Sequence, residues 1–217
     1  MTLAIRLGGA GGQGIALAGL ILAEAAVAAG RRVVCTQAHG PESRGGASRS
    51  DVIISERRVA FPVPRQLDVL AALTQEAWDR SRRALVSSGM AIVDAGRVTV
   101  AADDAAAGYA LPIIETARAL TGSALGANMV MLGLVCELTA AVPPEILAEV
   151  AARRVPEFSR TLNLAAFDAG RKLAAGAPSL RIFGPRRRPK DLPVWRGTSG
   201  RPLRGLLPAM RRSPGGS

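Results

Sequence analysis

The chain has 217 residues, of which 48% are hydrophobic and 3% aromatic, and its formal net charge is +11. This length suits one domain with an appendage, and an aliphatic core suits a layered α/β or α fold. A membrane span is not expected, because Glu24 interrupts the longest apolar stretch before it reaches the roughly 18 residues that a spanning helix needs. Residues 1–14 show no signal-peptide pattern, so we expect a cytoplasmic protein.

The first elements along the chain predict a βαβ unit. The apolar segment 3–7 predicts a strand, and the glycine-rich segment 8–14 predicts a tight turn. An Ala- and Leu-rich helix is expected over 15–29, with Gly30 as its C-terminal cap. The β-branched residues of 32–36 predict a second strand.

Further strands and a helix follow in alternation. The segment 40–49, GPESRGGASR, is rich in turn formers and charge and predicts a polar loop before a strand at 51–54. Strands are expected at 68–73 and 91–93, with an amphipathic helix over 75–86 between them. The alternation predicts an α/β fold with a Rossmann-like, mostly parallel sheet flanked by helices.

The C-terminal part is predicted to be helical and to end in a basic extension. Helices are expected at 113–120, 128–138, 144–153 and 162–173. Pro144 suits the first turn of its helix because it has no backbone donor to leave unpaired. After Gly176 the chain is rich in Pro, Gly and Arg, so we expect a domain over 1–176 and a flexible or partner-docked extension over 177–217.

The basic charge belongs mainly to that extension. Residues 1–180 carry 18 Lys and Arg against 16 Asp and Glu, whereas residues 181–217 carry 10 basic residues against Asp191. Few aromatic side chains, Phe183 and Trp195, accompany the arginines, so nucleic-acid binding is the weaker interpretation. Docking on an acidic partner subunit is the simpler use of this charge.

Two cysteines, Cys35 and Cys136, form no CxxC pair and no zinc or iron–sulfur spacing. We expect reduced core residues and no metal site, so any cluster chemistry would come from a partner.

The glycine turn is the first candidate binding segment. Gly9, Gly11 and Gly14 satisfy GxGxxG between a predicted strand and helix, where a phosphate could approach the helix N-terminus. A dinucleotide site also needs an acid at the end of the second strand, where this chain has Thr36 and Gln37. Two roles of the glycines therefore remain as alternatives: tight packing of the helix on the strand, or contact with a phosphate-bearing ligand such as coenzyme A. The candidate contacts are Gly9, Gly11, Gly12, Gln13 and Gly14.

The polar loop is the second candidate. Two guanidinium groups and exposed glycine amides suit the oxygens of phosphate or carboxylate. The alternative is a structural loop held by an ion pair between Glu42 and an arginine. The candidate contacts are His39, Gly40, Pro41, Glu42, Arg44, Gly45, Gly46, Ser48 and Arg49.

Three segments carry a family resemblance: GGAGGQG at 8–14, HGPESRGGASRSDVIIS at 39–55 and GANMVMLG at 126–133. In this order they resemble the gamma subunit of the 2-oxoacid:ferredoxin oxidoreductases, over roughly residues 3–173. In that family a Tyr commonly precedes the GPE sequence, whereas this chain has His39, its single histidine. Asn128 is expected to cap a helix, with Met129 in the core or an interface.

The resemblance implies a complex that oxidatively decarboxylates a 2-oxoacid with coenzyme A and passes electrons through iron–sulfur clusters to ferredoxin. The alpha and beta partners, with a delta subunit in some complexes, would hold thiamine diphosphate, Mg²⁺ and the clusters. The gamma chain would be a non-catalytic subunit that helps to form the coenzyme A site. The middle segment favours 2-oxoglutarate as substrate, with pyruvate or arylpyruvate next. A free-standing nucleotide-binding Rossmann module is the alternative.

Overall fold

The computed structural model describes residues 2–40, 46–101, 108–176 and 182–183. Within these ranges the strands are β1 (Thr2–Ala10), β2 (Arg32–His39), β3 (Ala47–Ser55), β4 (Leu67–Ala72), β5 (Leu85–Asp94), β6 (Gly108–Leu111) and β7 (Ile182–Phe183). The α-helices are α1 (Ile15–Ala28), α2 (Gln75–Ser81), α3 (Ile113–Thr121), α4 (Ala127–Thr139), α5 (Pro144–Arg154) and α6 (Arg160–Ala175). Short 3-10 helices cover Arg82–Ala84, Ala124–Gly126 and Glu157–Ser159.

The strands form one mixed sheet in the order β2-β3-β1-β4-β5-β6-β7. β1, β4, β5 and β6 are parallel neighbours, whereas β3 is antiparallel to both β1 and β2. β2 therefore runs in the same direction as β1, with β3 inserted between the two halves of the predicted βαβ unit. The α/β, mostly parallel sheet with a helical C-terminal part is confirmed.

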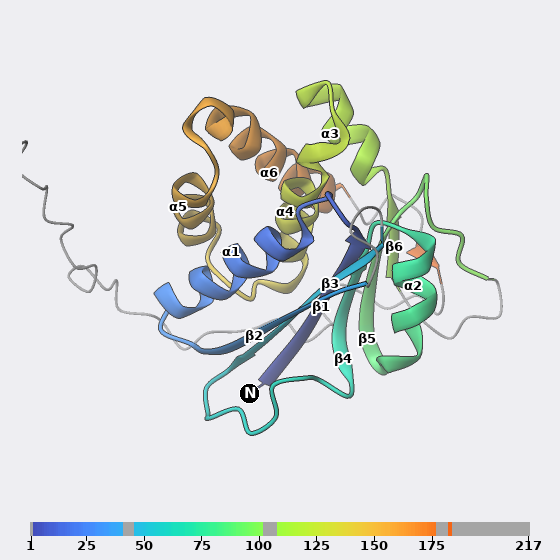
Figure 1. Ribbon diagram of the computed structural model, residues 1–217, viewed down its shortest axis with the longest axis vertical. Coiled ribbons are helices and arrows are strands. Elements are labelled where there is room, and N and C mark those ends of the chain that lie inside the picture. Colours follow the sequence, from blue (N-terminus) through green and yellow to red (C-terminus); the bar gives the residue numbers. More distant parts are fainter. Residues whose placement is uncertain (1, 41–45, 102–107, 177–181, 184–217) are drawn as a thin grey trace, which may run out of the picture.

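Helices cover the two faces of the sheet unequally. α1, α4, α5 and α6 gather on one face and α2 lies on the other (Figure 1). Leu3, Ile5 and Leu7 of β1 belong to the larger core cluster, which includes residues of α1 and α4. Trp78 of α2 packs in a second cluster with residues of β4 and β5. Strand alternation turns Arg6, between Ile5 and Leu7, to the face that α2 covers.

Two helix-end predictions are confirmed. Gly30 has φ 77°, and its N–H donates to Val27 O at 2.8 Å, while Arg31 N–H donates to Ala26 O at 3.0 Å. These two bonds form a Schellman motif, which ends α1 where the chain must turn into β2. Pro144 occupies the first turn of α5.

Other boundaries differ from the sequence expectations. The helix expected over 75–86 ends at Ser81, because the chain passes through a 3-10 turn into β5 at Leu85. β5 begins before the expected 91–93, because Leu85 and Val86 fitted the apolar pattern of the expected helix and the exposed Ser87 and Ser88 interrupt the apolar pattern of the strand. The predicted end of the loop 40–49 is wrong, because β3 begins at Ala47, which pairs with Ala10. The connection 40–46 is shorter than the dozen or so residues of a parallel crossover, so β2 and β3 form a hairpin.

The expected extension over 177–217 lies largely outside the described residues. Its described part, β7, pairs antiparallel with β6 and adds a strand to that edge of the sheet. The domain boundary at 176 stays a prediction. None of the helices in the described ranges is long and apolar enough to cross a membrane.

Candidate functional site

The glycine turn and the second candidate segment meet at the carboxyl edge of the parallel strands. Gly9 at the end of β1 and His39 at the end of β2 both pair with Ser48 of β3. Gly11 N–H donates to Gly46 O at 2.7 Å, and Gly40 N–H donates to Ala47 O at 2.8 Å. In open α/β sheets, ligands bind at this edge, next to the N-termini of the following helices.

The turn adopts a backbone that glycine alone takes readily. Gly12 has φ 87° and Gly14 has φ 69°, both in the left-handed region. Gly14 is the residue before α1, and no side chain caps the helix there. The first backbone N–H groups of α1 therefore start directly from the glycine turn.

The Gln13 side chain folds back onto the glycine turn and forms a hydrogen bond within it. Its Oε1 accepts a hydrogen bond from Ala10 N–H at 2.7 Å. A Cβ built on Gly9 would lie 2.5 Å from that same oxygen. Gly9 thus leaves the space that the Gln13 side chain occupies, which supports the packing interpretation for these two residues.

Asn128 brings the third signature segment to the same place. Its side chain is buried in the structure, and its Nδ2 donates to Gly14 O at 3.3 Å. Its Oδ1 accepts from Met129 N–H at 2.8 Å. The expectation that Asn128 caps the helix is wrong, because α4 already begins at Ala127, with Gly126 at the N-cap position and no side-chain cap. Met129 is fully buried, as expected for the core. The link between Asn128 and Gly14 was not predicted from the sequence.

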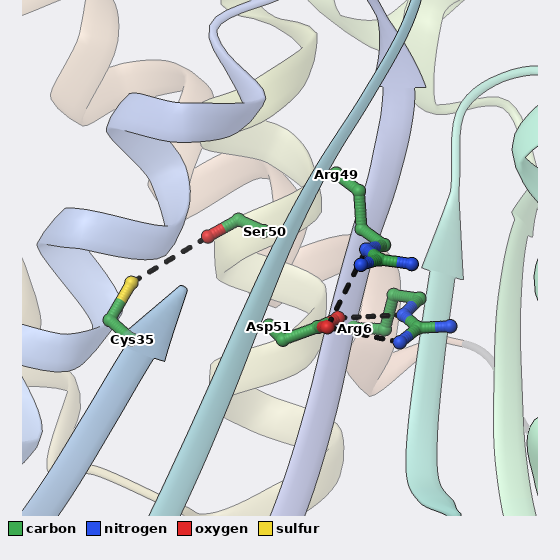
Figure 2. Close-up of polar contacts among 5 residues, drawn as sticks. All are labelled: Arg6, Cys35, Arg49, Ser50 and Asp51. Carbon is green, nitrogen blue, oxygen red and sulfur yellow. Dashed lines mark hydrogen bonds and ion pairs between the residues drawn. The ribbon is translucent and has the colours of Figure 1, made fainter. Parts of the chain in front are cut away.

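Side chains of β3 alternate between the two faces of the sheet. Ser50 points toward α1, where its Oγ lies 3.7 Å from Cys35 Sγ, whereas Arg49 and Asp51 point to the opposite face (Figure 2). Ser48 shares the face of Ser50, because the strand has a period of two residues. Ser48 and Arg49, two candidates for one site, therefore lie on opposite faces.

Arg49 belongs to a charge cluster with Arg6 and Asp51 (Figure 2). Arg6 Nε donates to Asp51 Oδ1 at 2.6 Å and Arg6 Nη2 donates to Oδ2 at 3.0 Å. Arg49 Nε lies 3.5 Å from the same Oδ2, and its side chain is 41% exposed. Two guanidinium groups thus share one carboxylate, which leaves the cluster with a net positive charge at the half-exposed Arg49.

Arg6 and Asp51 were not singled out in the sequence. Arg6 could have been noticed as the one charged residue inside the apolar strand predicted at 3–7. The strand register places it directly opposite Asp51. The described residues place the candidates Gly9, Gly11, Gly12, Gln13, Gly14, His39, Gly40, Gly46, Ser48 and Arg49 at this edge. Pro41, Glu42, Arg44 and Gly45, with the alternative Glu42 ion pair, lie outside the described residues.

Both cysteines are free thiols. Burial raises the pKa of Cys136 to about 12. Burial also raises the pKa of Cys35; the Ser50 hydrogen bond opposes this shift and the negative charge of Asp51 adds to it. Both side chains are therefore neutral thiols at pH 7, which makes them poor nucleophiles and poor metal ligands. Within the described ranges, no group of three His, Cys, Asp or Glu residues is placed to hold a metal.

The fold and the three converging segments define a Rossmann-like α/β domain with a glycine-rich carboxyl edge. The sequence model of the family described as "Pyruvate ferredoxin/flavodoxin oxidoreductase" matches residues 4–173, so the chain belongs to this family. A 2-oxoglutarate synthase subunit KorC from Methanocaldococcus jannaschii is 37% identical over 173 residues, which cover 78% of this chain and 92% of the relative.

Two solved structures share the fold. The gamma subunit of a keto/oxoacid ferredoxin oxidoreductase from Geobacter sulfurreducens PCA is 42% identical, with a TM-score of 0.74 over 82% of this chain and 98% of that one. The 2-oxoglutarate:ferredoxin oxidoreductase from Magnetococcus marinus, solved with 2-oxoglutarate, coenzyme A and succinyl-CoA bound, is 27% identical. Its TM-score is 0.73, over 86% of this chain and 32% of that one. The resemblance to gamma subunits of 2-oxoacid:ferredoxin oxidoreductases is confirmed.

Proposed function

We propose that this chain is the gamma-type subunit of a multisubunit enzyme that converts a 2-oxoacid, coenzyme A and oxidised ferredoxin into an acyl-CoA, carbon dioxide and reduced ferredoxin. The observation that carries the proposal is the convergence of the three signature segments at one edge of the sheet, through the Gly11–Gly46 and Asn128–Gly14 hydrogen bonds. The relatives named as 2-oxoglutarate synthase subunits support 2-oxoglutarate as the substrate of the complex.

The cofactors of such a complex are assigned to the alpha, beta and delta partners. Thiamine diphosphate would accept the electron pair that decarboxylation releases, and iron–sulfur clusters would carry the electrons to ferredoxin. The described residues do not fit a cluster, because Cys35 on β2 and Cys136 on α4 are the two cysteines of the chain, fewer than a cluster needs, and both have a raised thiol pKa. The role of this chain in the complex is therefore to support assembly and to contact a ligand.

Coenzyme A fits the charge pattern of the carboxyl edge. The glycine turn offers backbone N–H groups near the start of α1, while Arg49 offers a guanidinium on the other face of the sheet. A single phosphate cannot contact two groups on opposite faces, but coenzyme A carries a diphosphate and a separate 3′-phosphate. We assign the glycine turn to one of these groups and Arg49 to the other.

The free-standing dinucleotide module is the weaker function. In such modules an acid near the end of the second strand holds the ribose hydroxyls. Here Gln37 lies near the end of β2, and its Nε2 donates to Ala16 O at 3.1 Å. The position therefore ties β2 to α1 and offers no carboxylate to a ribose.

Isolation of the complex tests the proposed function. The chain, carrying an affinity tag and purified under native conditions, is expected to bring with it a thiamine diphosphate-binding chain and a brown iron–sulfur absorbance. The eluate should reduce ferredoxin with 2-oxoglutarate and coenzyme A, faster than with pyruvate or a branched-chain 2-oxoacid. A colourless eluate that holds this chain alone would contradict the proposal.

Arg49→Gln tests the coenzyme A contact in that purified complex. Loss of a charge-assisted hydrogen bond is expected to raise the KM for coenzyme A about tenfold or more and to leave the KM for the 2-oxoacid unchanged. The matched control is Arg153→Gln on α5, which removes an exposed arginine paired with Glu149. An unchanged KM for coenzyme A in Arg49→Gln would exclude this contact.

A further inference from the structure

The loop between β3 and β4, residues 56–66, lies at the amino edge of the sheet, opposite the glycine turn (Figure 1). We call it the Phe61 loop. It starts after Ser55, which pairs with Thr2 at the start of β1 and with Arg32 at the start of β2. A partner bound here would leave the carboxyl edge open for a ligand.

The tip of the Phe61 loop exposes two large apolar side chains. Phe61 is 76% exposed and Val63 is 48% exposed. Pro62 and Pro64 alternate with them and fix two backbone φ angles. A restrained loop loses less entropy on binding than a free one, so this apolar pair is preorganised for a pocket.

Arginines flank the apolar tip on both sides along the chain. Arg57, Arg58 and Arg65 are exposed. Arg32 is exposed beside them, since it pairs with Ser55. The acidic neighbour Glu56 lies 3.9 Å from Arg31, and its single charge does not balance the positive charges of the loop.

We infer that the Phe61 loop docks onto another subunit of the oxidoreductase complex, at an acidic surface that carries an apolar pocket. Aromatic and arginine side chains dominate the energetics of protein interfaces, and charge complementarity speeds and orients the encounter. A nucleic acid would satisfy the arginines but has no pocket for Phe61 and Val63. The inference rests on the proposed function, because the partner is a chain of that complex.

The test uses tagged Phe61→Asp and Phe158→Asp variants of the full chain, each expressed in its native cells beside the untagged partner subunits. Phe158 is the matched control, because it is 91% exposed and lies in the 3-10 helix between α5 and α6. The readout is the amount of the thiamine diphosphate-binding subunit recovered per tagged chain at increasing salt. We expect at least a tenfold loss for Phe61→Asp and less than a twofold change for Phe158→Asp.

A second variant, Arg57→Glu with Arg58→Glu, keeps Phe61 and is expected to weaken recovery more at low salt than at high salt. Full recovery with Phe61→Asp would overturn the docking surface and leave the proposed function intact. Wild-type chain that recovers no thiamine-binding subunit would overturn both. Equal losses for both phenylalanine variants, or Phe61-dependent binding to vesicles of phosphatidylcholine and phosphatidylserine, would also overturn it.

Discussion

Asp51→Asn is expected to lower the free energy of unfolding by about 3–5 kcal/mol, because it leaves a buried guanidinium without its counter-charge. The side chains of Arg6 and Asp51 are 7% and 1% exposed, and both carboxylate oxygens accept from Arg6. An asparagine keeps the shape, but it presents one amide N–H₂ to a group that can only donate. Urea denaturation of the purified chain, followed by circular dichroism, measures the loss.

Two further variants separate the buried pair from its exposed neighbour. Arg49→Gln should change stability by less than about 1 kcal/mol, since Arg49 is half exposed and its contact with Asp51 is long. The double variant Arg6→Met with Asp51→Leu should cost less than Asp51→Asn alone, because no charge is left buried without a partner. A loss below about 1 kcal/mol for Asp51→Asn would mean that the pair contributes no more than an exposed one.

Elements with a strong local pattern could be predicted from the sequence. The helices expected at 113–120, 144–153 and 162–173 match α3, α5 and α6 to within two residues at each end. Their limits are set by local signals such as Pro144 and the end of apolar periodicity. The short strands β6 and β7 have no such signal, because their length comes from pairing with a neighbouring strand.

The candidate site was predictable as a set of segments but not as a geometry. Asn128 and Gly14 are separated by 114 residues, and nothing local indicates that one side chain contacts the other backbone. The sequence did not show that Ser48 and Arg49 lie on opposite faces of the sheet, because the segment was predicted to be a loop up to residue 49. Once Ala47 is known to begin β3, strand alternation puts Arg49 beside Asp51 and away from α1.

The contact between α4 and α6 depends on two glycines in a way that the sequence did not show. A Cβ on Gly133 would lie 2.1 Å from Phe167 O, and a Cβ on Gly170 would lie 2.1 Å from Val130 O. Each glycine thus faces a backbone carbonyl of the other helix. A backbone atom cannot rotate away as a side chain does, so an added methyl group must push the helices apart.

Gly133→Ala and Gly170→Ala are therefore each expected to destabilise the chain by about 3 kcal/mol or more, as in severe overpacking of a core. This holds although alanine favours a helix over glycine by about 1 kcal/mol. The control is Gly176→Ala at the end of α6, where φ is −82° and an added Cβ would lie 3.7 Å from Leu173 O. Its melting temperature should stay within about 4 °C of the wild type, which corresponds to roughly 1 kcal/mol at this chain length. If Gly133→Ala melts like Gly176→Ala, the two helices do not cross at these glycines, and the packing of α4 against α6 must be different.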